Sequence, residues 1–234
     1  DGILQLTFHT DGGPLHWGGV PHQEFPQAFA DVGSDPKNRV VIITGTGDSF
    51  SGPPGSAQGT PKRAPREWDK TYWEGKRLLT NLLDIEVPMI SAINGPALRH
   101  SEIPLLCDIV LASESAAFQD SGHFISGLVP GDGMHVVYPL LLGLNRGRYF
   151  LLTGQTIESQ EAKQLGLVNE VLPKSDLLPR AWTLARQLAQ QPDLVLRYTR
   201  VAMTQHVKRA MQDLLGYGLA LEGPGSADNL LNQS

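Results

Sequence analysis

Cysteine is almost absent from this sequence. The single residue, Cys107, cannot form a disulfide within the chain, and its apolar neighbours indicate a core side chain rather than a reactive thiol. No apolar run approaches the roughly 20 residues that cross a bilayer, and no signal peptide is visible. We therefore expect a soluble, cytoplasmic protein with no membrane partner. Because the chain starts at Asp1, almost inside a predicted strand, we also expect that an N-terminal segment is missing from it.

Basic charge is also scarce. The 19 Lys and Arg residues are outnumbered by 24 Asp and Glu residues, the formal net charge is -5, and no Lys/Arg-rich run occurs. Because phosphate backbones bind to basic surfaces, this balance argues against a nucleic-acid partner.

Motifs for metals and nucleotides are missing as well. The histidines show no HExxH and no closely paired spacing, and the chain has no GxGxxG motif or P-loop. The stretch from Gly47 to Pro53 only faintly resembles a serine-hydrolase signature and lacks a complete G-x-S-x-G elbow. The sequence therefore predicts no metal and no organic cofactor.

What is present is enough apolar sequence for one domain. The chain has 234 residues, 41% of them hydrophobic, so it can bury one substantial core. Strand patterns are predicted over 3–7, 39–44, 89–93, 107–112 and 168–172. Helical patterns are predicted over 23–31, 67–87, 101–106, 156–165, 176–190 and 192–221. This order predicts an α/β fold, with a core domain over 1–175 and a helical C-terminal region over 176–234.

Two histidines are candidates for chemistry. His123 and Asp132 lie nine residues apart across a turn-rich segment. A carboxylate that accepts a hydrogen bond from one imidazole nitrogen fixes the tautomer and makes the other nitrogen a better base. His100 directly precedes a predicted helix start, where a donor could stabilise a negative oxygen. A structural His123 and a water-facing His100 fit the same pattern, so both readings stay open here.

Several short motifs occur in a specific order along the chain. They are Phe50-Ser51-Gly52, Asn94-Gly95-Pro96-Ala97-Leu98, Cys107-Asp108-Ile109-Val110-Leu111-Ala112, Gly127-Leu128-Val129-Pro130-Gly131, Leu152-Thr153-Gly154 and Gly166-Leu167-Val168-Asn169-Glu170-Val171. In this order, from about residue 3 to about residue 205, they resemble the enoyl-CoA hydratase (crotonase) family. The resemblance implies a crotonase-like spiral of ββα turns, a helical C-terminal trimerisation region and an oxyanion hole of two backbone N–H groups.

The chain departs from the family pattern at its catalytic positions. The first oxyanion donor aligns near Pro54, which has no N–H, and the second is replaced at or near His100. Where a hydratase carries a catalytic glutamate, this chain has His123. We therefore expect that a standard thioester oxyanion hole cannot form, and the two-glutamate hydratase mechanism is in doubt.

A second set of motifs accompanies these departures. They are His100-Ser101-Glu102-Ile103-Pro104, Phe118-Gln119-Asp120, His123-Phe124, Val129-Pro130-Gly131-Asp132-Gly133 and the run from Asn145 to Gln155. They resemble the β-diketone hydrolase branch of the crotonase superfamily, typified by oxocamphor hydrolase.

The branch resemblance implies a role for each candidate residue. His123, oriented by Asp132, would deprotonate water, and the hydroxide would attack one carbonyl of a β-diketone in a retro-Claisen cleavage. His100 would stabilise the negative oxygen, Trp17 would donate its indole N–H to a substrate carbonyl, and Glu222 would approach from the C-terminal helix. By their residue types alone, Trp17 could equally be a packing residue and Glu222 a solvated surface charge.

Two other functions are compatible with the resemblance. One is an ordinary acyl-CoA hydratase or isomerase, and the other is a catalytically silent crotonase-fold scaffold that works through its trimer interface. Apolar residues near the candidate site favour a small hydrophobic diketone as the partner; they are Phe124, Ile125, Leu128 and Met134. The family resemblance also implies a homotrimer or a dimer of trimers.

Overall fold

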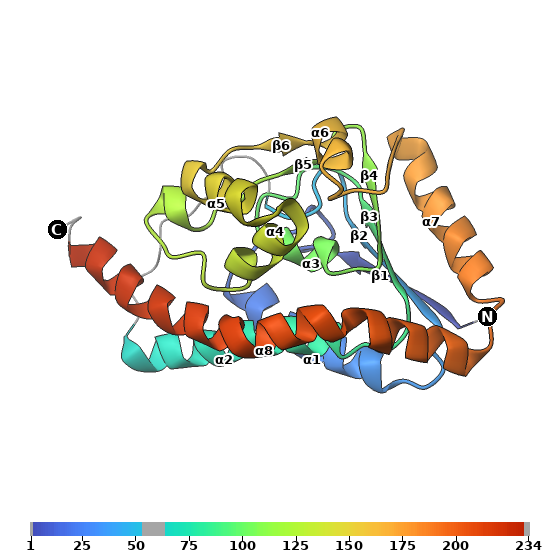
Figure 1. Ribbon diagram of the computed structural model, residues 1–234, viewed down its shortest axis with the longest axis horizontal. Helices are drawn as coiled ribbons and strands as arrows, with labels where there is room; N and C mark the ends of the chain where they lie inside the picture. The colour runs from blue at the N-terminus through green and yellow to red at the C-terminus, as the bar shows by residue number, and fades with distance from the viewer. Residues whose placement is uncertain (1, 53–63, 232–234) are drawn as a thin grey trace.

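The computed structural model describes residues 2–52 and 64–231. Its central feature is a five-stranded parallel sheet with the strand order β1-β2-β3-β4-β7 (Figure 1). The strands are β1 (Ile3–Phe8), β2 (Val40–Gly45), β3 (Met89–Ile93), β4 (Ile109–Ser113) and β7 (Glu170–Leu172). Strands covered on both faces are mostly apolar, as β2 and β3 are, with Thr44 and Ser91 as their buried polar residues. The five predicted strands are therefore confirmed, with ends that shift by one or two residues.

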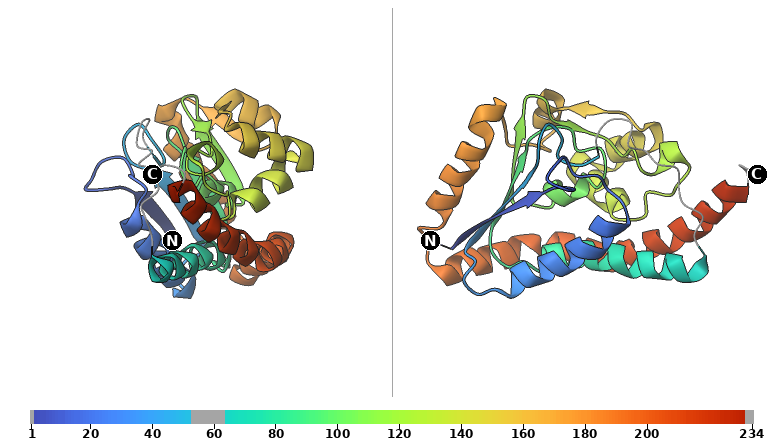
Figure 2. Two further views of the ribbon diagram at one scale, coloured as in Figure 1. Left: turned by 90° about the vertical axis from the view of Figure 1, so that its left-hand side faces the viewer. Right: turned by 180° about the vertical axis from the view of Figure 1, so that it is seen from behind.

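Helices cover both faces of this sheet. Successive side chains of a strand point to opposite faces. Val40 and Ile42 accordingly pack against α7 (Lys174–Leu188), whereas Val41 and Ile43 belong to the larger core on the other face. That second face is covered by α1 (Gly19–Ser34), α2 (Pro65–Leu83) and α8 (Asp193–Leu231), which lie side by side in Figures 1 and 2.

The long helix α8 is tied to the body by one buried cation. The Arg200 side chain is fully buried, and its Nε donates to the carbonyl of Ile85 at 2.6 Å while Nη1 pairs with Oδ1 of Asp108 at 2.5 Å. Oδ2 of Asp108 in turn accepts from the backbone N–H of Met89 at 2.7 Å. These contacts fasten α8 to the segments that lead into β3 and β4.

Beyond β2, β3 and β4 the chain bends into a second layer of short extended segments. Ser51 pairs with Ala97, and Ala97 pairs with Phe118 in β5 (Ala117–Phe118). β5 continues this layer by pairing antiparallel with β6 (Ile157–Glu158). A strand of the large sheet followed by a bent short segment thus recurs along the chain. This confirms the predicted α/β spiral of ββα turns.

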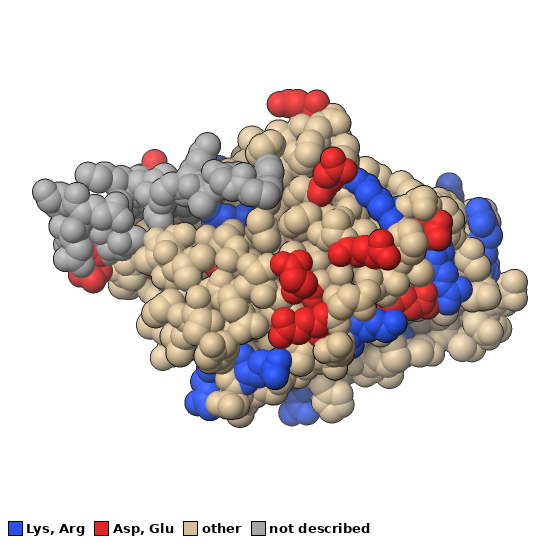
Figure 3. All heavy atoms as spheres, turned by 90° about the horizontal axis from the view of Figure 1, so that it is seen from above, with Lys and Arg blue, Asp and Glu red and all other residues tan. Residues whose placement is uncertain are grey.

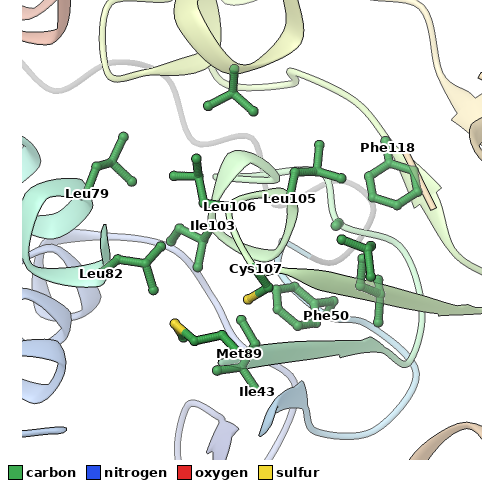
Figure 4. Close-up of a cluster of buried hydrophobic side chains, with 14 of the residues drawn as sticks. Ile43, Phe50, Leu79, Leu82, Met89, Ile103, Leu105, Leu106, Cys107 and Phe118 are labelled. Atoms are coloured by element: carbon green, nitrogen blue, oxygen red, sulfur yellow. The ribbon is translucent and has the colours of Figure 1, made fainter. Parts of the chain in front are cut away.

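A cluster of buried apolar side chains fills the space between the large sheet, α2 and the short helix α3 (Glu102–Leu105). Figure 4 shows its members from several elements: Ile43, Phe50, Leu79, Leu82, Met89, Ile103, Leu105, Leu106, Cys107 and Phe118. Burial raises the pKa of the Cys107 thiol, which keeps it protonated and unreactive. The predicted core role of this cysteine is confirmed.

Two helices in the middle of the chain were not expected from the sequence. They are α4 (Met134–Leu142) and α5 (Leu144–Thr153), separated by Gly143, whose φ is 80°. α4 is apolar on most sides and contains Pro139, so it shows no helical stripe that stands out from its surroundings.

Some predicted helices have different ends. The helix expected over 156–165 begins as β6 and continues as α6 (Ser159–Gln164), because its first residues pair with β5. α1 and α8 are both longer than predicted, and each contains a proline, a residue that usually marks a helix boundary. Both C-terminal helices pack on the core, and the proposed division at residue 175 stays a prediction.

The surface carries charges of both signs. Figure 3 shows acidic and basic side chains interspersed on one face, without a broad basic area there. Among the helices of the described residues, none combines the length and the apolar character needed to cross a membrane.

Candidate active site

Three loops that follow strands bring the candidate residues together. Trp17 lies in the loop after β1, His100 in the loop after β3 and His123 in the loop after β5. Asp132 joins them from the segment just before α4. Carboxyl ends of parallel strands lie at one edge of a sheet, where α/β folds place their sites.

Hydrogen bonds hold these loops in place. The side chain of Asn94, directly after β3, accepts from the N–H of Gly45 at 3.0 Å and donates to the carbonyl of Gly47 at 2.9 Å. Ser121 donates to the carbonyl of Leu98 from its backbone N–H at 3.1 Å and from its hydroxyl at 2.6 Å. These two hydrogen bonds between Ser121 and Leu98 join the loop that carries His123 to the loop that carries His100.

The imidazole of His123 lies between two carboxylates. Its Nδ1 is 2.6 Å from Oδ1 of Asp120, and its Nε2 is 3.2 Å from Oδ2 of Asp132. All three side chains are buried. The structure therefore brings His123 and Asp132 together, but it corrects the expectation that the second nitrogen faces water. Asp120, one turn earlier in the chain, occupies that side of the ring.

The ring of His100 is held by a different acid. Its Nδ1 lies 2.7 Å from Oε1 of Glu102 and 3.4 Å from Oδ2 of Asp132. The backbone of His100 has a φ of 49°, in the left-handed region that few residues other than glycine adopt. Such backbone conformations cluster at functional sites, where the surrounding structure holds them. Asp132 thus faces both histidines through one oxygen.

The indole of Trp17 packs on the His100 ring. The two ring centroids are 3.9 Å apart, with an interplanar angle of 35°. His22 meets both rings near edge-on, with centroid distances of 5.3 Å and 5.1 Å. Nε1 of Trp17 is buried and has no hydrogen-bond partner in the described part of the chain. Buried donors are normally paired, so this N–H is available to a ligand.

Burial and nearby charges shift the pKa values of His100 and His123 in opposite directions. Burial lowers the pKa of His100 to about 4, and the nearby Asp132 only partly offsets this effect. Burial also disfavours charge on His123, but the Asp132 and Asp120 carboxylates outweigh it and raise the pKa of His123 well above its usual value. At neutral pH, His100 is therefore neutral, whereas the two carboxylates favour the protonated form of His123.

The pKa values of the buried acids Glu102 and Asp132 also shift in opposite directions. Burial raises the pKa of Glu102 well above its usual value, and repulsion by Asp132 adds to this. Burial is the largest single influence on Asp132 and acts in the same direction, but the attraction of the neighbouring histidines and the hydrogen bond with His123 together outweigh it and lower the pKa of Asp132. Arg99 is partly buried and interacts with the Asp120 and Asp132 charges. Two cationic groups, Arg99 and His123, thus face two carboxylates, and the site is close to neutral.

Glu222 lies on the face of α8 that packs against the loop before α4. A Cβ on Gly131 would lie 2.2 Å from the carbonyl oxygen of Gly218, and a Cβ on Gly225 would lie 3.0 Å from Cγ2 of Val129. Glu222 lies on the same face of α8 as Gly218 and Gly225, and only 7% of its surface is exposed. The alternative of a solvated surface charge is therefore wrong, while the catalytic role stays a prediction.

One set of ligand-type atoms has a spacing at which a cation could be held. Atoms of His100, Glu102 and Asp132 lie within 4.8 Å of one another. However, two ligands bound at about 2.0–2.2 Å to one tetrahedral ion lie about 3.3 Å apart. The 2.7 Å between Nδ1 of His100 and Oε1 of Glu102 is shorter than this and matches a hydrogen bond. We therefore assign these atoms to a hydrogen-bonded pair.

Several predicted features fall elsewhere. Pro54 lies outside the described residues. Met134 is fully buried in the core, so it does not belong to a substrate surface. Phe124 and Ile125 follow His123 in a short 3-10 helix and are half exposed.

Asp120 and Glu102 belong to motifs of the sequence, but their role at the site is not predicted from it. The spacing of Asp120 to His123, three residues, was a usable signal, because such a separation spans one turn.

Comparison with known proteins identifies the family. Residues 21–220 match the family model described as enoyl-CoA hydratase/isomerase. The chain belongs to this family, which lies in the crotonase superfamily. A relative, the crotonyl-CoA hydratase of Syntrophomonas wolfei, is 31% identical over 196 residues, which cover 80% of this chain and 74% of the relative.

Solved structures of the enoyl-CoA hydratase/isomerase fold are also similar. One is a β-diketone hydrolase from the cyanobacterium Anabaena sp. PCC 7120 bound to (S)-3-oxocyclohexyl acetic acid. It is 54% identical, has a TM-score of 0.91, and the match covers 97% of this chain and 91% of that one. An enoyl-CoA hydratase/isomerase from Mycobacterium paratuberculosis is 28% identical with a TM-score of 0.85, over 97% and 91% of the two chains.

Proposed function

We propose that this protein hydrolyses the carbon–carbon bond between the two carbonyls of a β-diketone, without a metal or an organic cofactor. The observation that carries the proposal is the buried His123 imidazole between Asp120 and Asp132, beside a neutral His100 stacked on Trp17. In this arrangement His123 and its aspartates can exchange a proton, and the neighbouring His100 and Trp17 can stabilise a negative oxygen.

Binding of a neutral diketone suits the charges in the site. The two cationic groups and two carboxylates balance, so an uncharged substrate disturbs no ion pair. The unpaired Nε1 of Trp17 supplies one donor for a carbonyl oxygen. Both polar contacts of the His100 ring in the described part are at Nδ1, which leaves Nε2 for the substrate.

Water is activated by His123 and Asp132 acting as one unit. The two groups share a proton across 3.2 Å, and closely coupled groups titrate as a pair rather than one by one. Water adds through its oxygen to one carbonyl carbon, and one of its protons passes to this pair, at the Asp132 carboxylate when His123 already carries its own proton. The carbonyl electrons move onto the oxygen, whose negative charge Trp17 and His100 stabilise.

The carbon–carbon bond then breaks. Its electron pair moves onto the second carbonyl as an enolate, and the first carbonyl becomes a carboxylic acid. The proton held by the His123 and Asp132 pair passes to the enolate carbon and gives a ketone. The pair returns to its starting state, and one water has been consumed.

Similarity to the cyanobacterial β-diketone hydrolase supports this reaction. The compound bound to that protein carries a ketone and a carboxylic acid on one skeleton. Rejoining its carboxyl carbon to the carbon beside the ketone produces a bicyclic 1,3-diketone. Such a keto acid is therefore what hydrolytic cleavage of a bicyclic β-diketone yields, and cyclic diketones are the first substrates to test.

An acyl-CoA hydratase or isomerase is the second candidate, because curated relatives at about 30% identity carry such names. Its mechanism needs groups that this site replaces. The position expected for a catalytic glutamate holds His123, and the position of one backbone donor holds His100. A silent scaffold has less support, because the buried histidines and acids are matched as donors and acceptors.

We also propose that the protein works as a homotrimer or a dimer of trimers. Apolar side chains are exposed on α4, α5 and α8, and they supply a surface for self-association: Leu140, Leu141, Leu144, Tyr149, Met203 and Tyr217. Sedimentation velocity would show a species of three or six chains, and a monomer at micromolar concentration would contradict this.

The function is tested by offering the purified protein a cyclic 1,3-diketone, an open-chain 1,3-diketone and a crotonyl thioester. Loss of diketone absorbance is followed together with acid formation, without CoA or added metal. The proposal predicts a single keto acid from the cyclic compound and an acid plus a ketone from the open-chain one. Hydration of the thioester with both diketones untouched would contradict it, and so would inactivity toward all three compounds.

A further inference from the structure

Glu102 is a buried acid to which the reaction described above assigns no role. Its exposed fraction is 0%, and Oε1 lies 2.7 Å from Nδ1 of His100. The other oxygen, Oε2, is buried and has no hydrogen-bond partner among the described residues. An ionised carboxylate at such a depth normally has several donors or an opposite charge beside it. Glu102 has neither at Oε2.

The groups around Glu102 disfavour a negative charge on it. Oδ2 of Asp132 faces the same imidazole nitrogen at 3.4 Å, so two acidic side chains share one ring atom. Asp120 adds further negative charge, and His123, whose positive charge favours an ionised Glu102, already contacts Asp120 and Asp132. Of the acids at this site, Glu102 is therefore the one that keeps its proton, in agreement with the burial that raises its pKa.

The place of that proton follows from the available acceptors. A proton on Oε2 would have no acceptor in the described structure, which is unfavourable in a buried position. A proton on Oε1 lies on the 2.7 Å line to Nδ1 of His100. Nδ1 then accepts, and a neutral imidazole carries its single hydrogen on the other nitrogen, Nε2.

The alternative protonation has the opposite consequence. An ionised Glu102 would accept a hydrogen bond from Nδ1–H of His100. The neutral ring would then present a lone pair at Nε2 and would repel an enolate oxygen. The state of one buried acid thus decides whether His100 is a donor or an acceptor toward the substrate.

We infer that Glu102, as a neutral acid hydrogen-bonded to Nδ1, is the positioning residue that holds His100 in its Nε2–H tautomer, so that this nitrogen donates to the negative oxygen of the substrate. The catalytic meaning of this tautomer rests on the proposed function. The tautomer itself is a property of the resting protein, and it can be measured without any substrate.

The direct test is the tautomer of His100 in the full chain labelled with ¹⁵N-histidine. A long-range ¹H–¹⁵N spectrum near pH 7.5 distinguishes a protonated from an unprotonated ring nitrogen, and the His100→Gln variant identifies the signals. The inference predicts a neutral ring with hydrogen on Nε2. Hydrogen on Nδ1, or on both nitrogens, would overturn it. Either result stands whether or not any diketone is cleaved.

Two variants then separate positioning from packing. Glu102→Met keeps the volume but removes the donor, and we expect kcat to fall roughly 10- to 100-fold with a smaller change in KM, because the lost interaction develops in the transition state. Glu102→Gln offers an amide N–H to Nδ1, so it should recover most of this loss together with the Nε2–H signal. Equal losses of activity in the two variants would show a packing role only and would overturn the inference.

The pH dependence of stability supplies a readout that activity does not share. A carboxyl group with a raised pKa in the folded state contributes its stability fully below its unfolded pKa of about 4.5 and loses it as the pH rises. The melting temperature of the wild type should therefore rise relative to Glu102→Gln as the pH is lowered from 8 toward about 5. A constant difference between the two proteins would overturn the neutral-acid assignment.

Discussion

Oδ1 of Asp120 lies 2.6 Å from Nδ1 of His123, and this is the shorter of the two carboxylate contacts of that imidazole. Asp120 therefore orients the ring, while Asp132 lies beside Nε2, where the proposed reaction exchanges a proton with water. The distinction gives the two aspartates different roles. Asp120 acts on the histidine, and Asp132 acts with it.

The first prediction concerns Asp120. Asp120→Asn keeps an oxygen acceptor for Nδ1 but removes a negative charge, so the pKa of His123 should fall. A hydrogen bond to a charged group is worth roughly 1.5–3 kcal/mol, which corresponds to a decrease in kcat of about 10- to 150-fold. NMR titration of His123 and steady-state kinetics measure both effects. Asp213→Asn, at an exposed position on α8, is the matched control. An unchanged His123 titration would contradict the orienting role.

The second prediction concerns stability and pH. The pKa of His123 is raised in the folded protein, so its contribution is fully present below the unfolded pKa of about 6.5 and is lost as the pH rises through the folded value. Relative to His123→Gln, the wild type should lose stability as the pH is raised above about 6.5. Urea unfolding at several pH values gives the comparison. A wild type that gains relative stability over this range would show that His123 is neutral when folded.

The third prediction concerns the indole N–H of Trp17. Trp17→Phe keeps an aromatic ring on His100 but removes the donor, and an unmet hydrogen bond costs roughly 1–3 kcal/mol. We expect kcat/KM for a diketone to fall about 5- to 150-fold, with little change in melting temperature. Trp73→Phe, on the exposed side of α2, serves as control. Equal activity of the two variants would mean that Trp17 only packs.

The fourth prediction concerns the attachment of α8. Arg200→Leu leaves the Asp108 carboxylate without its cation and removes the donor to Ile85. Breaking a buried ion pair from one side costs roughly 3–5 kcal/mol, which urea unfolding can measure. Arg197→Leu removes a half-exposed pair with Glu86 and should cost less than about 1 kcal/mol. Similar costs for the two variants would place the anchor of α8 elsewhere.

Most of the fold could be predicted from the sequence because its strands are distinct. The runs around Val40 and Met89 are mostly apolar and short, and glycine or proline separates them from the helices. The helices α4 and α5 could not be predicted in this way. α4 is buried on most sides, so its pattern lacks the period that marks a helix with one wet face.

The candidate site was predicted in part, and the limit is physical. Local motifs pointed to His100, His123 and Asp132, but a motif does not say which nitrogen meets which oxygen. Glu102 lies only two residues after His100 in the chain. The 2.7 Å contact between their side chains depends on the left-handed backbone at His100. Burial, which sets the charge of both groups, arises from packing between elements distant in sequence.

The most direct test of the proposed reaction is the fate of a cyclic 1,3-diketone in H₂¹⁸O, followed by mass spectrometry for the wild type, His123→Ala and the exposed-histidine control His206→Ala. We expect a keto acid with one ¹⁸O in its carboxyl group from the wild type and the control. We expect a rate at least about 100-fold lower for His123→Ala, because the loss of His123 removes the pair that carries out general acid–base catalysis. An unchanged diketone with the wild type, or equal rates of labelling in all three proteins, would contradict the assignment of this site.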